Sequence, residues 1–507
     1  MRHSITIGSL YDDLSERLAA LRKDAPEVRQ SRAVVEQALN EDQPYYGINT
    51  GFGAMATQRV NSEDLNQLQR NLLLSHAVGV GDWIPYEVAS LMLQLKIHAL
   101  SLGNSGVSMP VFNTLLQWEQ ARLIPAMPQK GSVGASGDLA PLAHMSLPLL
   151  GFGYMWDGSK PDTTGHSEPE EAQHVLDRHH IEPVALQAKD GLSLINGTQM
   201  MSGYGAYAME RLQHIVKMAD LIGAMSLEAL QGSIKPFDAR IQELRPHPGQ
   251  ASVAQNVREL LVQSEILESH RHCGKVQDPY CLRCMPQVHG ATRDALTHTT
   301  QVIERELNSV TDNPLVFENG DIMSGGNFHG QPLALAMDYA AMAMAELASI
   351  SERRTYLLLE GHDGLPKLLM QKTGINSGFM IPQYTAAALV SENKVLTHPA
   401  SVDTIPTSMG QEDHVSMGSI SALKLYDVLE NLEQVLGIEL FTAAQALDYR
   451  KPLRPGKGVK LAHELVRDHI KHAEEDHYFK DDINRAVGFI KTNALLDHIE
   501  SKLTGLI

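Results

Sequence analysis

The sequence has little cysteine, and its few cysteines are closely grouped. They are Cys273, Cys281 and Cys284, in a chain of 507 residues. An odd number in one short segment excludes a disulfide framework and predicts reduced thiols. Cys281 and Cys284 have the spacing of a metal or redox pair, with histidines nearby at His270, His272 and His289. Because a structural zinc site needs a second pair of ligands at defined spacing, we predict no metal site and interpret the cysteines as small, partly buried thiols.

Positive charge is also scarce. Lysine and arginine number 42 against 60 acidic residues, which gives a formal net charge of −18. Nucleic acids and anionic membranes require clustered basic residues, so the charge argues against both as partners and favours a small-molecule ligand. No charge-free stretch has the length that spans a bilayer, and the first residues lack the apolar run of a secretory signal. We expect a cytoplasmic protein.

Several common catalytic motifs are absent. The sequence contains no G-x-x-x-x-G-K-[ST] loop for a nucleotide phosphate, and "GINTGFG" lacks the glycine spacing of a dinucleotide site. Ser136 lies in G-A-S-G-D, which differs from the G-x-S-x-G pattern of a nucleophilic serine. These absences disfavour a nucleotide-dependent enzyme and a serine hydrolase.

Helical periodicity is present along most of the chain. Residues 62–81 begin with Ser62 as an N-cap and carry Leu65, Leu68 and Leu72 at helical spacing. The same pattern predicts helices near 12–22, 85–102, 109–122 and 138–150, and long helices over 198–232 and 329–360. Helices of that length usually pack in a bundle. Alternating patterns are few: "SITIG" at 4–8, and "PLVFENGDIMSG" at 314–325 with a hairpin turn at Asn319-Gly320.

Two polar segments stand out between the helical patterns. Residues 156–173 combine glycine, proline and charge, which predicts an exposed loop and a soft domain boundary. Residues 467–482 contain several histidines, but these fall among alternating charges at mixed spacing. That pattern favours a solvated helix face over a metal site.

The segment "GSVGASGDLAPLAHM" at 131–145 places three small residues inside a run of glycines. Alone, Ala-Ser-Gly is common in loops before helices. Further phrases accompany it in order: "YYGINTGFGA" (45–54), "LINGTQMM" (194–201), "QDPYCLRC" (277–284), "SGGNFHGQP" (324–332) and "GQEDHVSMG" (410–418). Together they closely resemble the aromatic amino-acid ammonia-lyase family over nearly the full chain, and especially its members that act on histidine.

The resemblance implies a prosthetic group built from the chain itself. In this family, Ala135, Ser136 and Gly137 would cyclise into 4-methylidene-imidazol-5-one, an electrophile, with no external cofactor. Gly137 lacks a Cβ, so its nitrogen can bend back onto the carbonyl of Ala135, and Ser136 then loses its hydroxyl as water. Asp138 is expected to cap the helix that follows.

The implied reaction is the elimination of ammonia from L-histidine to give trans-urocanate, the first step of histidine degradation. The electrophile would add either to the amine or to the imidazole, and the sequence leaves both open. A tyrosine or phenylalanine ammonia-lyase, or an aminomutase, would use the same electrophile. A non-catalytic assembly of the wider fumarase and aspartase superfamily is a further alternative.

The resemblance also assigns roles to site residues. Tyr46 resembles the base that removes the β-proton, which requires its phenolate form to be favoured. Arg283 resembles the clamp for the substrate carboxylate, a role that suits its planar fork. Asn196 is expected to hydrogen-bond the prosthetic group and the amine. Gln277 and Tyr280 are expected to line the pocket, Tyr280 as a further catalytic residue, and Phe328 is expected to cover it.

Substrate choice is expected to depend on His76 and Glu412. The order Ser75-His76 is that of the histidine enzymes, and a carboxylate at 412 can pair with an imidazole but gains nothing from a phenyl ring. Met409-Gly410 stand where members commonly have alanine and asparagine, which leaves the strictness of selection open. Cys281 replaces a more usual serine.

The fold that the resemblance implies is mainly α and fumarase/aspartase-like. Residues 1–197 would form an N-terminal lobe with the electrophile, and residues 198–507 a long central helical bundle with a C-terminal helical region. Members are homotetramers whose active sites draw residues from three chains. The long Ala/Met/Leu helices fit this assembly, because they offer more apolar surface than one thin monomer would bury.

Overall fold

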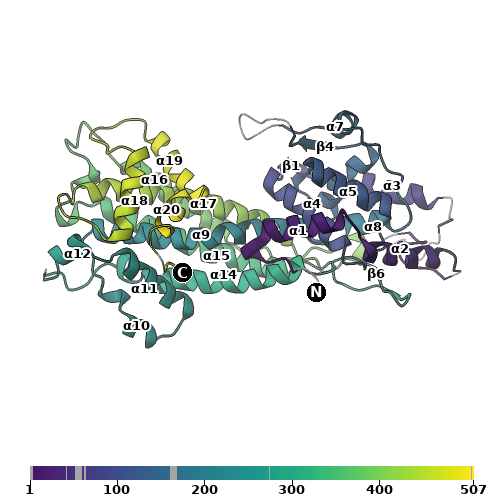
Figure 1. Ribbon diagram of the computed structural model, residues 1–507, viewed down its shortest axis with the longest axis horizontal. Helices are drawn as coiled ribbons and strands as arrows, with labels where there is room; N and C mark the ends of the chain where they lie inside the picture. The colour runs from purple at the N-terminus through teal and green to yellow at the C-terminus, as the bar shows by residue number, and fades with distance from the viewer. Residues whose placement is uncertain are drawn as a thin grey trace. The chain divides into compact units, whose positions relative to one another are not determined.

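A computed structural model describes residues 4–41, 43–51, 60–61, 64–159, 168–272, 274–503 and 505–507. The fold is mainly α-helical, as predicted (Figure 1). The chain forms two compact units. The first comprises residues 1–210, 300–338 and 399–423, and the second comprises 211–299, 339–398 and 424–507. The predicted division into an N-terminal lobe of residues 1–197 and a helical region of residues 198–507 remains a prediction.

Over its described residues, the first unit contains short helices and three small antiparallel sheets. Its helices are α1 (Leu10–Leu21), α2 (Pro26–Leu39), α3 (Leu65–His76), α4 (Tyr86–Leu100), α5 (Met109–Ala121), α6 (Leu139–Ser146), α7 (Ala172–Arg178) and α8 (Asp190–Ile195). The sheets pair β1 (Val80–Trp83) with β3 (Pro128–Lys130), β4 (Tyr154–Asp157) with both β2 (Leu123–Ala126) and β5 (Glu170–Glu171), and β6 (Leu315–Val316) with β7 (Ile322–Met323). The helices predicted near 12–22, 85–102, 109–122 and 138–150 are thereby confirmed.

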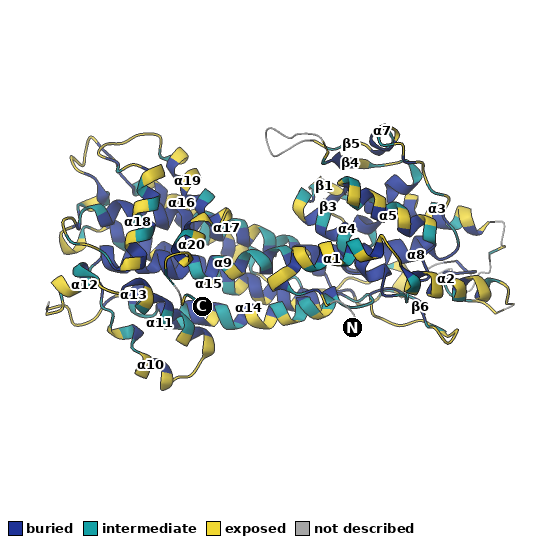
Figure 2. Cartoon of the chain, in the orientation of Figure 1, coloured by how far each residue is buried: buried dark blue, intermediate teal, exposed yellow. Residues whose placement is uncertain are grey.

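Four long helices belong in sequence to both units. They are α9 (Gln199–Ala229), α14 (Met285–Leu307), α15 (Gln331–Leu359) and α17 (Gly418–Asp448). Helix α9 is buried along most of its length (Figure 2). Within the second unit, the buried carboxylate of Glu439 on α17 accepts hydrogen bonds from Ser226 on α9 and from Ser351 and Arg354 on α15. These bonds join three of the long helices, as a helical bundle requires.

The second unit is completed by shorter helices. They are α10 (Ala239–Glu243), α11 (Pro248–Leu260), α12 (Glu265–Ser269), α13 (Tyr280–Arg283), α16 (Met380–Leu396), α18 (Lys457–His469), α19 (Phe479–Lys491) and α20 (Ala494–Glu500).

Helix α15 is long and apolar enough, by length and composition, to cross a membrane, and it alone meets that test among the described residues. However, 61% of its most apolar window is buried inside the protein, and the helix carries Asp338 and Glu346. The buried core helix of a protein in water meets the same test, and α15 fits that description.

The predicted strand at 4–8 is wrong. Ile7–Ser9 form a 3₁₀ helix, and residues 4–6 have no regular structure. The Asn308 side chain accepts from the Ile5 amide and donates to the Ile5 carbonyl, both at 2.8 Å. These side-chain bonds take the place of a strand partner, while Ile5 and Ile7 are both buried as core residues.

The predicted hairpin at 314–325 is confirmed. Strands β6 and β7 pair antiparallel, and Phe317 N donates to Asp321 O at 2.9 Å across the turn. Gly320 has a φ of +92°, in the region that side chains with a Cβ rarely adopt. The Asn319-Gly320 signal therefore identified the turn correctly.

The structure corrects both predictions on polar segments. Residues 154–157 and 170–171 pair within one sheet of the first unit, so no boundary falls between them. Residues 160–167 lie outside the described part of the chain. The segment 467–482 is not one helix, since α18 ends at His469 and α19 begins at Phe479. In this segment, His472 Nδ1 lies 2.9 Å from Asp448 Oδ2. The Asp448 side chain is buried, and a buried carboxylate requires such partners.

Candidate functional site

The Ala-Ser-Gly segment forms a tight loop between β3 and α6. Ser136 has a φ of +49°, and Gly137 a φ of +84°. A positive φ is unusual for a residue with a side chain, and such strain is concentrated at functional sites. A Cβ on Gly137 would lie 2.0 Å from Gly197 O, so the loop approaches its neighbour as closely as only glycine allows.

The loop is attached to the start of α9. Gly197 N donates to Ser136 O at 3.2 Å, and Asp138 N donates to Gly197 O at 2.7 Å. The Asp138 carboxylate accepts from Met200 N at 2.9 Å and from Met201 N at 3.1 Å. The predicted cap on α6 is therefore wrong: Asp138 makes no side-chain cap bond there and caps α9 instead. It does so because the bridge between Gly137 and Gly197 brings its side chain to the free amides of that helix.

Asp138 is fully buried in this position. It accepts a third hydrogen bond from the Ser419 hydroxyl at 2.9 Å, at the start of α17. Burial raises the pKa of Asp138 to about 7, and the three donors favour the carboxylate. Through this one side chain, the loop is held against two of the long helices.

Asn196 is the C-cap residue of α8 and directly precedes Gly197, which contacts the loop. Its Nδ2 donates to Asn313 O at 2.6 Å and lies 3.3 Å from Asp312 Oδ1. Asp312 in turn pairs with the buried Lys189 at 2.7 Å. Lys96 Nζ donates to Asn196 O at 2.7 Å. Asn196 is therefore held in place through both its side chain and its carbonyl.

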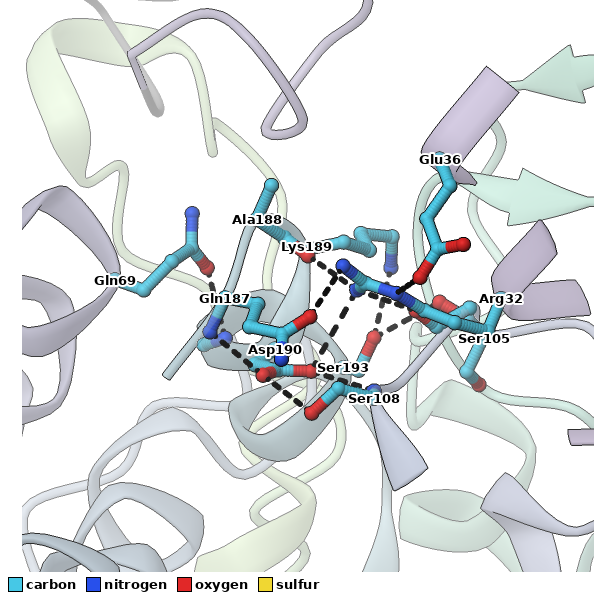
Figure 3. A network of polar contacts seen from close by, with 12 residues as sticks. Arg32, Glu36, Gln69, Ser105, Ser108, Gln187, Ala188, Lys189, Asp190 and Ser193 are labelled. Carbon is cyan, nitrogen blue, oxygen red and sulfur yellow. Dashed lines mark hydrogen bonds and ion pairs between the residues drawn. The ribbon is translucent and has the colours of Figure 1, made fainter. Parts of the chain in front are cut away.

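A second group of polar residues holds α8 itself (Figure 3). Asp190 accepts from Ser108 N at 2.7 Å, from Ser108 Oγ at 2.8 Å and from Gln187 N at 2.8 Å. Arg32 donates to Ala188 O at 2.9 Å. Because buried polar groups with satisfied partners specify one arrangement, this network gives Asn196 a rigid support.

A pocket of about 460 Å³ opens in front of the loop. Five predicted site residues line it: Tyr46, Ala135, Ser136, Phe328 and Glu412. Its other lining residues are Gly134, Asn313, Ser324, Gly325, Gly326, His329, Gln411, Asp413, His414 and Val415. Segments far apart in the sequence thus meet around Ala135 and Ser136, two of the three residues that would form the electrophile.

Glu412 is the half-buried carboxylate of this pocket. Its Oε2 atom is buried and has no hydrogen-bond partner among the residues that the structure describes. An unpaired buried carboxylate oxygen costs free energy unless a ligand donates to it. Glu412 therefore offers the pocket an acceptor suited to an N–H group.

Met409 and Gly410 lie in the turn that precedes Glu412. Thr407 N donates to Glu412 O at 2.9 Å and closes the turn. Both Met409 and Gly410 have left-handed backbone conformations, and Met409 is 89% exposed. Neither residue lines the pocket. The departure from the family pattern thus lies on the exposed side of the turn.

His329 and His414 are pocket residues that the sequence reasoning missed. Their ring centroids lie 5.8 Å apart, and His329 Nε2 is 3.0 Å from His414 O. Both belong to phrases that carry the resemblance, one residue after Phe328 and two after Glu412. Their ionisable side chains within those phrases were the signal that could have identified them.

His76, at the end of α3, lies outside the lining of this pocket. Its Nδ1 atom is 3.0 Å from Ser75 Oγ. Burial lowers the pKa of His76, which favours the neutral imidazole. Its expected role in substrate choice remains a prediction.

Gln277, Tyr280 and Arg283 belong to the second unit. Gln277 and Tyr280 are exposed and Arg283 is half-buried. The Arg283 guanidinium lies 4.4 Å from the centroid of the Tyr280 ring, and its Nε donates to Asp278 O at 2.9 Å. None of the three lines the pocket around Ser136. The structure thus brings Tyr280 and Arg283 together within the second unit.

Cys281 and Cys284, in the second unit, are free cysteines. Cys281 is buried, Cys284 is half-buried, and burial raises the pKa of the Cys281 thiol. Cys273 lies outside the described residues. Over the described part of the chain, no group of three or more histidine, cysteine, aspartate or glutamate side chains could hold a metal ion.

Known proteins resemble this chain over almost its whole length. The sequence profile of the aromatic amino acid lyase family matches residues 10–468. A histidine ammonia-lyase of Myxococcus xanthus is 49% identical over 479 residues, which cover 94% of this chain and 93% of that protein.

Two solved structures extend the comparison. The crystal structure of histidine ammonia-lyase from Trypanosoma cruzi has a TM-score of 0.87 and 38% identity, and covers 99% of this chain and 94% of its own. A tyrosine aminomutase from Streptomyces globisporus has a TM-score of 0.89 and 34% identity, with 99% and 98% covered. With a matching sequence profile and a matching fold over almost its whole length, the chain belongs to the aromatic amino acid lyase family.

Proposed function

We propose that this protein eliminates ammonia from L-histidine to give trans-urocanate, the first step of histidine degradation. The observation that carries the choice of substrate is Glu412, which lines the same pocket as Ser136 and whose buried Oε2 has no hydrogen-bond partner among the described residues. A carboxylate there can accept the N–H of an imidazole, whereas a phenyl or phenol ring has no such donor. The 49% identity to a histidine ammonia-lyase supports the same substrate.

We propose that Ala135, Ser136 and Gly137 cyclise into 4-methylidene-imidazol-5-one, with no external cofactor. The residues fit this group, because Gly134, Ser136 and Gly137 already have the positive φ angles of a compact turn. Gly197 and Asp138 would hold it, through the hydrogen bonds that join the loop to α9. When formed, the ring supplies an electrophilic carbon that assists departure of the amine or loss of the β-proton.

Tyr46 is the proposed base for the β-proton. Its side chain lines the pocket together with Ser136, as a group that reaches the substrate must. The neighbouring Tyr45 is bonded through its hydroxyl to Glu41 and does not line the pocket. The two adjacent tyrosines are thus assigned different roles.

The remaining residues would bind and orient the substrate. Glu412 would accept a hydrogen bond from the imidazole N–H of the substrate. Phe328, which also lines the pocket, would cover it. Asn196 contacts the prosthetic group and the amine from the end of α8, with His76 as a second selector for the imidazole. Arg283 clamps the carboxylate with its planar fork, next to Tyr280 and Gln277.

We propose a homotetramer in which different chains share each active site. Gln277, Tyr280 and Arg283 belong to the second unit, whereas the residues that line the pocket belong to the first. Another copy is proposed to supply these three residues, as the family resemblance implies. Helix α15 also exposes Leu335 (52%), Tyr339 (47%) and Met342 (40%) at intervals of four and three residues, on one face. Exposed apolar faces of this kind mark association surfaces.

The remaining proposals concern the location of the enzyme, its partners and its need for a metal ion. A formal charge of −18 supports a small-molecule ligand and argues against nucleic-acid or membrane partners. The enzyme is proposed to be cytoplasmic. Its proposed chemistry requires no metal ion, because the ring and Tyr46 supply the electrophile and the base.

The test is an assay of the purified chain with L-histidine, L-tyrosine and L-phenylalanine in parallel, with products identified by chromatography. We expect urocanate from histidine and no coumarate or cinnamate. Tyrosine chemistry is the second candidate, because the fold matches a tyrosine aminomutase with a TM-score of 0.89. Coumarate or β-tyrosine as the main product would support that candidate and overturn the proposed choice of histidine.

The variant Glu412→Gln tests the proposed selector. Loss of a charge-assisted hydrogen bond costs about 1.5–3 kcal/mol, so we expect KM for L-histidine to rise roughly 10- to 100-fold. Steady-state kinetics provide the measurement. The matched control is Glu318→Gln, which removes one charge from the exposed hairpin of the same unit and should leave KM unchanged. A wild-type KM in Glu412→Gln would refute the role of Glu412.

A further inference from the structure

Lys96, on α4, is a buried charged residue that the proposed mechanism does not use. It is only 2% exposed. Its Nζ donates to the carbonyl oxygen of Asn196 at 2.7 Å. The neighbouring buried lysine, Lys189, is paired instead with the carboxylate of Asp312. The two lysines therefore differ in their partners: the ammonium group of Lys96 contacts a peptide carbonyl, whereas that of Lys189 contacts a carboxylate.

That carbonyl belongs to the peptide group that contacts the Ala-Ser-Gly loop. The carbonyl of Asn196 and the amide of Gly197 form one peptide group, and Gly197 N donates to Ser136 O at 3.2 Å. An ammonium group on the oxygen of a peptide polarises it and makes its N–H a stronger donor. Lys96 therefore acts on Ser136 O through two consecutive hydrogen bonds.

The carbonyl oxygen of Ser136 remains in the proposed ring. Cyclisation joins Gly137 N to the carbonyl carbon of Ala135, and the two waters that leave carry away Ala135 O and Ser136 Oγ. The carbonyl of Ser136 is then conjugated with the methylidene carbon. A donor on that oxygen draws electron density away from the methylidene carbon, so it strengthens the electrophile.

We propose that Lys96 is a positioning residue that polarises the Asn196-Gly197 peptide and thereby activates the prosthetic ring. The inference rests on the proposed function, since it presupposes that Ala135, Ser136 and Gly137 form the ring. It concerns the rate of the chemical step, not the binding of histidine.

Burial makes a purely structural role for Lys96 costly. Burial lowers the pKa of Lys96 to about 7, and the charges facing it are those of Asp312, Lys189 and Asp138. A methionine of similar length would fill the same space without the desolvation cost of an ammonium group. Polarisation of the Asn196-Gly197 peptide by the ammonium group therefore explains why a lysine occupies position 96.

The experiment compares wild-type protein with Lys96→Met and Lys96→Arg. Intact mass reports ring formation, and kcat and KM are measured with L-histidine. The near-ultraviolet band of the ring is obtained as a difference spectrum against the same protein carrying Ser136→Ala, which cannot form the ring. Ring mass and spectrum are read without substrate, so neither depends on turnover.

We expect Lys96→Met to lose two waters as wild type does and to absorb at shorter wavelength. The kcat of Lys96→Met should fall roughly 10- to 100-fold, which is a smaller loss than the removal of a donor in direct contact with the reacting group causes. Its KM should stay within about twofold of the wild-type value. Lys96→Arg keeps the charge and should keep the band position and most of kcat. A merely structural role would not move the band while leaving ring formation intact.

Two outcomes would overturn the proposal. A Lys96→Met protein with unchanged band and kcat shows that the charge does not reach the ring. A folded Lys96→Met protein without the two-water deficit shows that Lys96 serves ring formation instead. If Lys96→Met does not fold, Lys96→Gln keeps a neutral donor in its place, and the same two readouts decide.

The proposed function fails in a different way. Wild-type protein with the mass deficit but no urocanate would overturn the substrate, while the band of Lys96→Met still tests the role of Lys96. Wild-type protein without the deficit would overturn the ring and the role of Lys96 together.

Discussion

Ser136→Ala should leave a folded protein with the full mass of its own sequence and a kcat lowered at least about 1,000-fold. The reason is that the methylidene carbon can come only from Ser136, whose hydroxyl leaves as the second water. Without that carbon no electrophile forms, although the pocket keeps its shape. Intact mass and the urocanate assay provide the two measurements.

Ser132→Ala is the matched control for this variant. Ser132 lies in the same loop, and its hydroxyl accepts from Gly134 N at 3.2 Å. Its hydroxyl is not one of the atoms lost, so the two-water deficit should remain. If Ser136→Ala kept its activity, the proposed electrophile would be wrong. If both variants lacked the deficit, loop geometry would be the cause, not the identity of the lost hydroxyl.

Tyr46→Phe should form the ring normally but lose most of its activity. Removing a general base typically lowers the rate 10²- to 10⁴-fold, so we expect kcat to fall by about that amount. KM should change less, because the phenyl ring still fills the pocket wall. Intact mass separates this loss from a failure to form the ring, and the kinetics are measured with L-histidine.

Tyr45→Phe is the control, since the chain offers a second tyrosine next to the first. Its hydroxyl is bonded to Glu41 and lies outside the pocket lining, so kcat should stay near the wild-type value. Near-normal turnover in Tyr46→Phe would assign the base to another residue. His329, on the pocket wall, would then be the residue to test next.

Periodicity predicted many of the helices because an amphipathic pattern is a local property. Helices α4, α5, α9 and α15 all fall within the ranges expected from their apolar spacing. The hairpin at Asn319-Gly320 was equally local, since its turn chemistry is written in two adjacent residues. The strand expected at 4–8 failed because a strand needs a partner, and at Ile5 the Asn308 side chain takes that place.

Motifs in the sequence predicted which residues belong to the site, but they did not predict the contacts that these residues make. Four predicted site residues, Tyr46 and Glu412 among them, line one pocket together with Ser136. The direction of the Asp138 side chain was not predictable, because its cap on α9 depends on how the loop meets Gly197. Lys96 carried no signal at all: it lies in an ordinary helical pattern, 100 residues before the carbonyl that it contacts.

The sequence by itself determined the helical class, the family and the identity of the residues that would form the electrophile. Those follow from local spacing and from short phrases whose chemistry requires particular residue types. Only the tertiary structure decided that Glu412 keeps an unpaired buried oxygen, that Asp138 joins the loop to α9, and that Lys96 reaches the loop through a peptide. Burial and hydrogen-bond pairing between distant segments exist only once the chain has folded, which is why no pattern along the sequence could specify them.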